Sequence, residues 1–146
     1  MALQNDREGS PVFFSLEMPN RLGELESLHL FFERVGLEAG WSDRLCMNMT
    51  LACEELLTNT ISYGFPQGGD HLLRISVRCS DRQIEVVLED EGVPFDPLAA
   101  GEPDLELSLD DRPIGGLGIH FAKRLMDEMA YERTPSGNRL VLLKKV

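Results

Sequence analysis

The sequence predicts an α+β fold, a two-layer α/β sandwich in which helices cover one face of a single mixed, mostly antiparallel sheet. Two observations predict this class. Apolar residues recur at three- and four-residue steps in the longer segments, as in amphipathic helices, and alternate with polar residues in several short ones, as in strands. The helical segments precede most of the strand segments, and no repeat divides the chain. We expect one domain over residues 1–146, with a flexible polar tail over about residues 1–10.

The first half of the chain predicts one strand and two helices. The apolar-rich run over residues 12–18 is typical of a strand. Residues 21–35 place leucine, phenylalanine and valine on one helical face, and Gly36 and Gly40 indicate the end of this helix. A second helix is expected over residues 42–63, because a serine is in place as its N-cap and a glycine follows its last turn.

The second half predicts a hairpin, a long loop, a helix and a last strand. Residues 72–79 and 84–88 alternate apolar and polar side chains on either side of a short turn, so they are expected to pair antiparallel. Residues 91–113 are rich in proline and acids, and a loop of this length is usually functional. A third helix is expected over residues 116–129 and a strand over residues 139–144.

Composition excludes several classes of protein. The net charge is −11 and no basic patch is visible, which argues against direct nucleic-acid binding. No stretch approaches the roughly 18 to 20 apolar residues of a membrane span, and the N-terminus does not resemble a signal peptide, so we expect a cytoplasmic protein. The three cysteines, Cys46, Cys53 and Cys79, are expected to be free core thiols.

Polar residues on the second predicted helix form the first candidate motif. Helical steps of three and four residues place Ala52, Glu55, Asn59 and Ser62 on one stripe beside apolar rows. An amide oxygen suits Mg²⁺, and a carboxylate one turn away can accept a proton. The alternative interpretation is a plain solvated face, which is common for such residues.

Two further motifs are each weak when taken alone. Asp90 ends an apolar strand just before Gly92, so its carboxylate could accept a hydrogen bond from an exocyclic amine; an ordinary acidic turn is the alternative. The glycine-rich run before the third helix leaves amide donors for a phosphate, although it is neither a Walker A loop nor a dinucleotide fingerprint. This run consists of Gly115, Gly116, Leu117 and Gly118.

The order and spacing of the three motifs together resemble the nucleotide-binding boxes of the superfamily of gyrase, the mismatch-repair ATPases and the histidine kinases. The sequence is most similar to the anti-sigma-factor serine/threonine kinase branch. Glu55 and Asn59 resemble its N box, Asp90 and Gly92 its first glycine box, and the glycine-rich run its second. The resemblance covers about residues 12–146 and implies the Bergerat fold of the histidine-kinase-like ATPases.

The resemblance also implies a role for each motif residue, with ATP and Mg²⁺ as cofactors. Asn59 would hold Mg²⁺, and Glu55 would be the general base. Asp90 would bind the adenine amine, with Gly92 letting the ring approach. The phosphates would meet Gly115, Gly116, Leu117 and Gly118, and residues 98–114 would form a lid.

In this family the phosphate acceptor is a serine or threonine of a small anti-sigma-factor antagonist protein, and the kinase also sequesters a sigma factor, usually as a homodimer. The sequence alone leaves a second function open, a non-catalytic ATP-binding module that regulates a protein partner. The catalytic domain of a histidine kinase and a gyrase-like clamp ATPase fit less well, because each needs helices or a second domain beyond these 146 residues.

Overall fold

The structure, a computed structural model, describes residues 10–99 and 116–146. Five strands form one sheet in the order β1-β2-β3-β5-β4. They are β1 (Val12–Pro19), β2 (Leu72–Cys79), β3 (Gln83–Asp90), β4 (Glu128–Arg133) and β5 (Asn138–Lys145). Every pairing between these strands is antiparallel, so the described sheet is wholly antiparallel rather than mixed. The predicted α+β class is confirmed.

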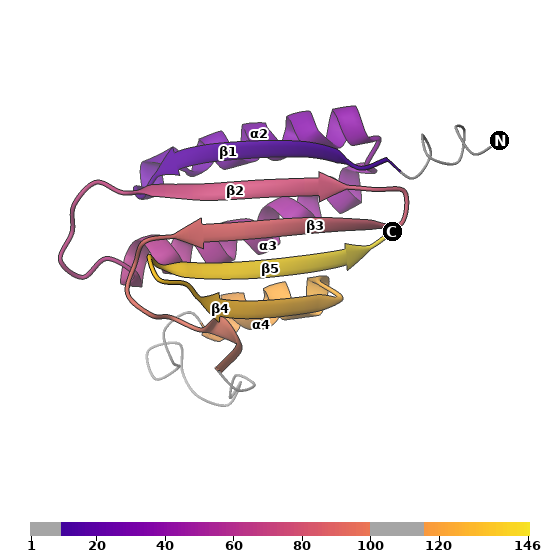
Figure 1. The fold of residues 1–146 in the computed structure, drawn as a ribbon. Coiled ribbons are helices and arrows are strands. Elements are labelled where there is room, and N and C mark those ends of the chain that lie inside the picture. The colour runs from indigo at the N-terminus through magenta and orange to yellow at the C-terminus, as the bar shows by residue number, and fades with distance from the viewer. Residues whose placement is uncertain (1–9, 100–115) are drawn as a thin grey trace.

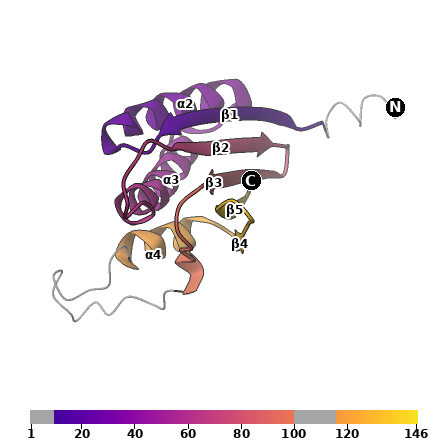
Figure 2. The ribbon, with the colours of Figure 1, turned by 60° about the vertical axis from the view of Figure 1, so that its left-hand side comes forward.

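Three helices cover one face of this sheet, as Figures 1 and 2 show from two directions. The helices are α2 (Leu25–Ala39), α3 (Asp43–Tyr63) and α4 (Gly116–Leu125), with short 3-10 turns η1 (Leu22–Glu24) and η2 (Pro97–Ala99). The core lies between the two layers, where alternate strand residues such as Ile75 and Val86 meet helix residues such as Phe32 and Leu57. In the described ranges no helix is long and apolar enough to cross a membrane.

Of the two glycines expected to end the first helix, Gly40 does so and Gly36 does not. Gly36 lies inside α2 and is buried, and the helix ends at Gly40, whose φ of 74° is the left-handed conformation that glycine adopts without strain. A Cβ at Gly36 would lie 3.1 Å from the Sγ of Cys46 on α3. Gly36 therefore marks a close contact between two helices, not a helix end.

The C-terminal part differs most from the prediction, because the third helix stops at Leu125 and a strand follows it. In β4 the half-buried Met129 and Tyr131 alternate with exposed residues, which is the two-residue period of a strand. The backbone N–H of Asp127 donates to the carbonyl of Leu143 (2.8 Å), and the Asp127 carboxylate accepts from the N–H of Lys145 (2.6 Å). These bonds to β5 turn the chain from helix into strand.

Candidate functional site

Helix α3 carries the first two candidate residues, and its start is where the sequence placed it. The Ser42 side chain accepts a hydrogen bond from the N–H of Leu45 (3.1 Å), which satisfies an otherwise unpaired donor of the first turn. On α3, Glu55 is half-buried and Asn59 is 7% exposed. Asn59 is therefore not on a plain solvated face, whereas Glu55 is partly open to solvent.

The fold brings Glu55 against Gly118 at the start of α4. A Cβ placed on Gly118 would overlap Oε2 of Glu55 and would lie 3.2 Å from its Cδ. A larger residue at position 118 would therefore displace the Glu55 carboxylate from its place beside α4. Gly116 begins α4, whereas Gly115 and the side chain of Leu117 lie outside the described part of the chain, as does most of the predicted lid.

The amide of Asn59 is the second unusual group on α3. Its Nδ2 is fully buried, and among the described residues it has no hydrogen-bond partner. Leaving such a group unpaired costs about 1–3 kcal/mol, so a buried orphan amide requires an explanation. One explanation is that the amide serves to bind a ligand. A half-turn of the amide group would present its oxygen, a type of ligand that Mg²⁺ accepts.

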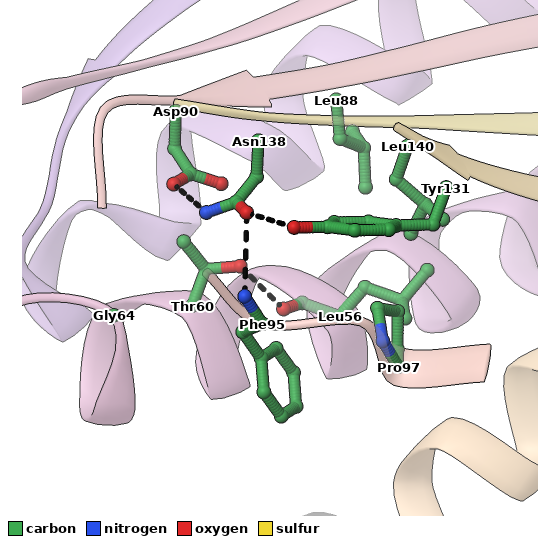
Figure 3. A pocket seen from close by; sticks show the side chains of 10 residues that line it. All are labelled: Leu56, Thr60, Gly64, Leu88, Asp90, Phe95, Pro97, Tyr131, Asn138 and Leu140. Carbon is green, nitrogen blue, oxygen red and sulfur yellow. Dashed lines mark hydrogen bonds between the residues drawn. The ribbon is translucent and has the colours of Figure 1, made fainter. Parts of the chain in front are cut away.

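A pocket opens where β3 ends, between the sheet and the C-terminal half of α3 (Figure 3). It is lined by Leu56, Thr60, Gly64, Leu88, Asp90, Phe95, Pro97, Tyr131, Asn138 and Leu140. The space open to the centre of a water molecule is about 30 Å³, so a purine ring requires the walls to move apart. The wall formed by residues 92–97 is a loop, which makes it the part best suited to move.

The pocket and the two candidate residues of α3 are neighbours on the helix. Leu56 and Thr60 line the pocket, and Glu55 and Asn59 each precede one of them by a single position, which is about 100° around the helix. Helix α3 thus connects the Asp90 pocket with the region of Glu55 and Gly118.

A polar network fixes the Asp90 end of the pocket. Oδ1 of Asp90 accepts from the N–H of Gly92 (2.8 Å) and from Nδ2 of Asn138 (2.9 Å). The amide oxygen of Asn138 accepts from the hydroxyl of Tyr131 and from the N–H of Phe95 (3.3 Å). Figure 3 shows Asn138 between the carboxylate and the Tyr131 ring.

Gly92 has a packing role in the same corner. Its N–H bonds to Asp90, and a Cβ on it would lie 2.6 Å from the carbonyl oxygen of Gly64 at the end of α3. The next residue, Val93, donates its N–H to that same carbonyl (2.8 Å). Glycine is therefore required for the loop to reach α3, whether or not a ligand is present.

Sequence reasoning did not identify Asn138 and Tyr131 as members of the pocket. Asn138 lies one residue before the strand predicted over residues 139–144, and Tyr131 lies in β4, where the sequence predicts no strand. The sequence signal is weak, because a Gly-Asn pair before an apolar strand is also an ordinary turn. The residue that Asn138 faces depends on the register between β3 and β5, which pairs Asn138 with Asp90.

Carboxylates, histidines and cysteines do not gather into a metal site here: the described residues contain no group of three or more that could hold an ion. Mg²⁺ in nucleotide sites usually takes one or two protein ligands and completes its coordination with phosphate oxygens and water.

Comparison with known proteins agrees with the fold and the motif spacing. Residues 18–144 match the family described as the histidine kinase-like ATPase domain. The chain is 32% identical over 112 residues to the serine/threonine-protein kinase BtrW of Bordetella bronchiseptica, covering 77% of this chain and 79% of the relative. It is 29% identical to the anti-sigma F factor of Clostridium novyi, covering 65% and 67% of the two chains. It is 25% identical to the serine-protein kinase RsbW of Listeria innocua, covering 79% and 76%.

The family match extends over most of the chain and includes every motif residue that the resemblance was based on. The relatives are named as serine or serine/threonine kinases and as anti-sigma factors. The chain therefore belongs to the histidine kinase-like ATPase domain family and, within it, to the branch of the anti-sigma-factor kinases.

Proposed function

We propose that this protein is an ATP-dependent serine/threonine kinase that phosphorylates a small anti-sigma-factor antagonist protein in a partner-switching circuit and that also sequesters a sigma factor. The observation that carries the proposal is the arrangement along α3. A carboxylate, Glu55, lies beside Gly118 in the first turn of α4, and a buried amide without a partner among the described residues, Asn59, lies one turn further along α3. The next positions of the same helix line the Asp90 pocket.

The residues fit ATP in a consistent order. The Asp90 carboxylate accepts a hydrogen bond from the exocyclic amine of adenine. Apolar walls for the ring come from Leu56, Leu88 and Leu140. The phosphates meet the amides of the glycine-rich run at the start of α4, where the helix dipole favours negative charge. Bound Mg²⁺, held through Asn59, would neutralise charge on the phosphates, and the buried orphan amide fits that use.

Glu55 is the general base in this proposal. It takes the proton of the acceptor hydroxyl while that oxygen forms a bond to the γ-phosphorus, and the bond from the γ-phosphorus to the β-γ bridging oxygen breaks to release ADP. A phosphorylated serine or threonine and ADP are the products. Such a transfer depends chiefly on position and charge, which suits a site without a covalent nucleophile.

The printed names of the relatives support both halves of the function, since they describe protein kinases and anti-sigma factors. A single domain over residues 1–146, homodimer formation and a cytoplasmic location belong to the same proposal. The single domain and the location are expected from the length and composition of the sequence, and the homodimer from the family resemblance.

The proposal is tested by phosphate transfer. Purified protein is incubated with γ-labelled ATP, Mg²⁺ and antagonist-domain proteins from the same genome, and we expect label on one serine or threonine of one of them. Replacing that acceptor by alanine should abolish the label. Partner binding without transfer, unaffected by nucleotide in calorimetry, would instead identify the protein as a non-catalytic interaction module.

A further inference from the structure

Asn138, the first residue of β5, is only 7% exposed. Its side-chain amide makes several hydrogen bonds to residues around the pocket. Nδ2 donates to Oδ1 of Asp90 (2.9 Å) and to the carbonyl of Val93 (2.8 Å). Oδ1 accepts from the hydroxyl of Tyr131 and the N–H of Phe95 (3.3 Å). Its amide thus joins the end of β3, strand β4 and the loop that walls the pocket.

The surroundings determine which way this amide points. The oxygen side faces two groups that can only donate, the N–H of Phe95 and Nη1 of Arg133 (3.4 Å), and the Tyr131 hydroxyl, which donates here. The nitrogen side faces acceptors, a carboxylate and a carbonyl. A reversed amide would oppose N–H to N–H on one side and oxygen to oxygen on the other.

The consequence falls on the Asp90 carboxylate. Its Oδ1 takes two donors, from Asn138 and from the N–H of Gly92 (2.8 Å). In the part of the chain that the structure describes, no donor bonds to Oδ2. Within the described residues both donors thus bond to Oδ1, and Asp90 lines the pocket, so Oδ2 is the oxygen available to a donor bound there (Figure 3).

We propose that Asn138, oriented by Tyr131, is a positioning residue for base recognition: it holds the Asp90 carboxylate so that Oδ2 accepts the 6-amino group of a purine. This inference rests on the proposed nucleotide site. It assigns the preference for a 6-amino over a 6-oxo purine to the hydrogen-bonded series Tyr131, Asn138 and Asp90. A carboxylate only accepts hydrogen bonds, and the carbonyl of a 6-oxo purine has no hydrogen to donate. Asn138 itself need not touch the nucleotide.

The glycine before Asn138 supports the same assignment. A Cβ on Gly137 would overlap the carbonyl oxygen of Asp90 and would lie 2.8 Å from Cα of Glu91. The start of β5 therefore approaches the end of β3 more closely than any side chain would allow. This close approach is what places the Asn138 amide against the Asp90 carboxylate.

The test separates base recognition from general nucleotide binding. Affinities for ATP and for purine riboside 5′-triphosphate, which lacks only the 6-amino group, are measured by calorimetry in the presence of Mg²⁺. For wild-type protein we expect ATP to bind about tenfold to a hundredfold more tightly, the range of a hydrogen bond to a charged group. A positioning role predicts that Asn138→Ala reduces this ratio to about threefold or less, mainly by weakening ATP.

Two variants keep the result interpretable. Tyr131→Phe keeps the ring in the pocket wall and removes only the hydroxyl, so we expect an intermediate ratio even where Asn138→Ala fails to fold. Asn20→Ala is the matched control, because the Asn20 amide also bridges backbone groups, accepting from the N–H of His71 (3.0 Å) and donating to the carbonyl of Gly69 (3.2 Å). Asn20 is not in the pocket lining, so its variant should keep the wild-type ratio.

The outcomes distinguish this inference from the proposed function. A folded Asn138→Ala that retains the wild-type ratio, or that weakens both nucleotides equally, overturns the inference and leaves the nucleotide site intact. The same holds if Asn138→Ala does not fold and Tyr131→Phe keeps the full ratio. Wild-type protein that binds both nucleotides equally removes Asp90 from base recognition, and wild-type protein that binds neither overturns the proposed function as well.

Discussion

Glu55 and its neighbour Glu54 are adjacent on α3, yet their surroundings differ. Glu54 lies 3.3 Å from Nε2 of His29 on the neighbouring helix α2, whereas Glu55 faces the start of α4. Only the second carboxylate is placed toward the nucleotide in the proposed site. The pair therefore offers a matched comparison of two glutamates on one helix.

We expect Glu55→Gln to lower the rate of phosphate transfer by about 10²–10⁴, the usual contribution of a general base, and to change ATP affinity by less than about threefold. Transfer is followed with γ-labelled ATP and affinity by calorimetry. Glu54→Gln should leave the transfer rate unchanged. Equal losses of binding and transfer in Glu55→Gln would show that the carboxylate shapes the site without acting as a base.

Cys53 gives a pH-dependent prediction. Burial raises the pKa of this fully buried thiol from 9.0 to about 12. The thiol loses its proton near pH 9 in the unfolded chain and near pH 12 in the folded protein. The free energy of unfolding is therefore unaffected by this thiol below pH 9 and falls as the pH rises between these two values. We expect about 2 kcal/mol of unfolding free energy to be lost between pH 8.5 and 10.5 through this residue.

Urea unfolding at the two pH values measures this loss. Cys53→Ala, although less stable overall, should lose about 2 kcal/mol less over the same interval than the wild type. Identical losses in both proteins would mean that other groups account for the alkaline destabilisation.

At the scale of elements, α3 positions most of the candidate site, and its first turn is closed by Ser42. We expect Ser42→Ala to lower the free energy of unfolding by about 1 kcal/mol, because the N–H of Leu45 loses its partner. Chemical denaturation checks this value. Ser62→Ala, an exposed serine on the same helix, should change stability by less than about 0.5 kcal/mol; a similar loss in both variants would contradict the capping role.

Gly137, just before β5, lies against the backbone at the end of β3. We expect Gly137→Ala to lower the unfolding free energy by at least about 2 kcal/mol, since its Cβ would overlap the Asp90 carbonyl and would lie 2.7 Å from the carbonyl carbon. The control is Gly23→Ala, where a Cβ would have no neighbour within 4 Å. Equal stability of the two variants in urea unfolding would show that the strands separate at little cost.

For the whole molecule, the net charge of −11 opposes the compact state by self-repulsion. Salt screens this repulsion, because the Debye length falls from about 30 Å at 0.01 M to about 8 Å at 0.15 M. We expect the melting temperature to rise by about 2–5 °C between these concentrations of NaCl, measured by thermal unfolding without nucleotide. KCl should give the same shift, and an unchanged or lower melting temperature would contradict dominant self-repulsion.

Local patterns predicted much of this architecture. The α+β class, the N-cap at Ser42 and the hairpin of β2 and β3 follow from periodicity and turn residues, which are properties of neighbouring residues. The same reasoning misjudged Gly36, because a glycine in a helix can mark either an end or a close helix contact. It also missed β4. The apolar residues up to Met129 continue the helical spacing of α4, and the strand that follows is too short for its two-residue period to stand out.

The sequence by itself determined the family, the fold class and the residues on which a nucleotide site is proposed, because the order and spacing of motifs are properties of the linear sequence. Only the tertiary structure decided that Glu55 contacts Gly118, that the Asn59 amide is buried without a partner, and that Asn138 and Tyr131 hold Asp90. These facts depend on strand register and helix packing, which join residues far apart in the chain. The hydrogen bonds of an edge strand such as β4 come from its neighbour, so no local pattern contains them.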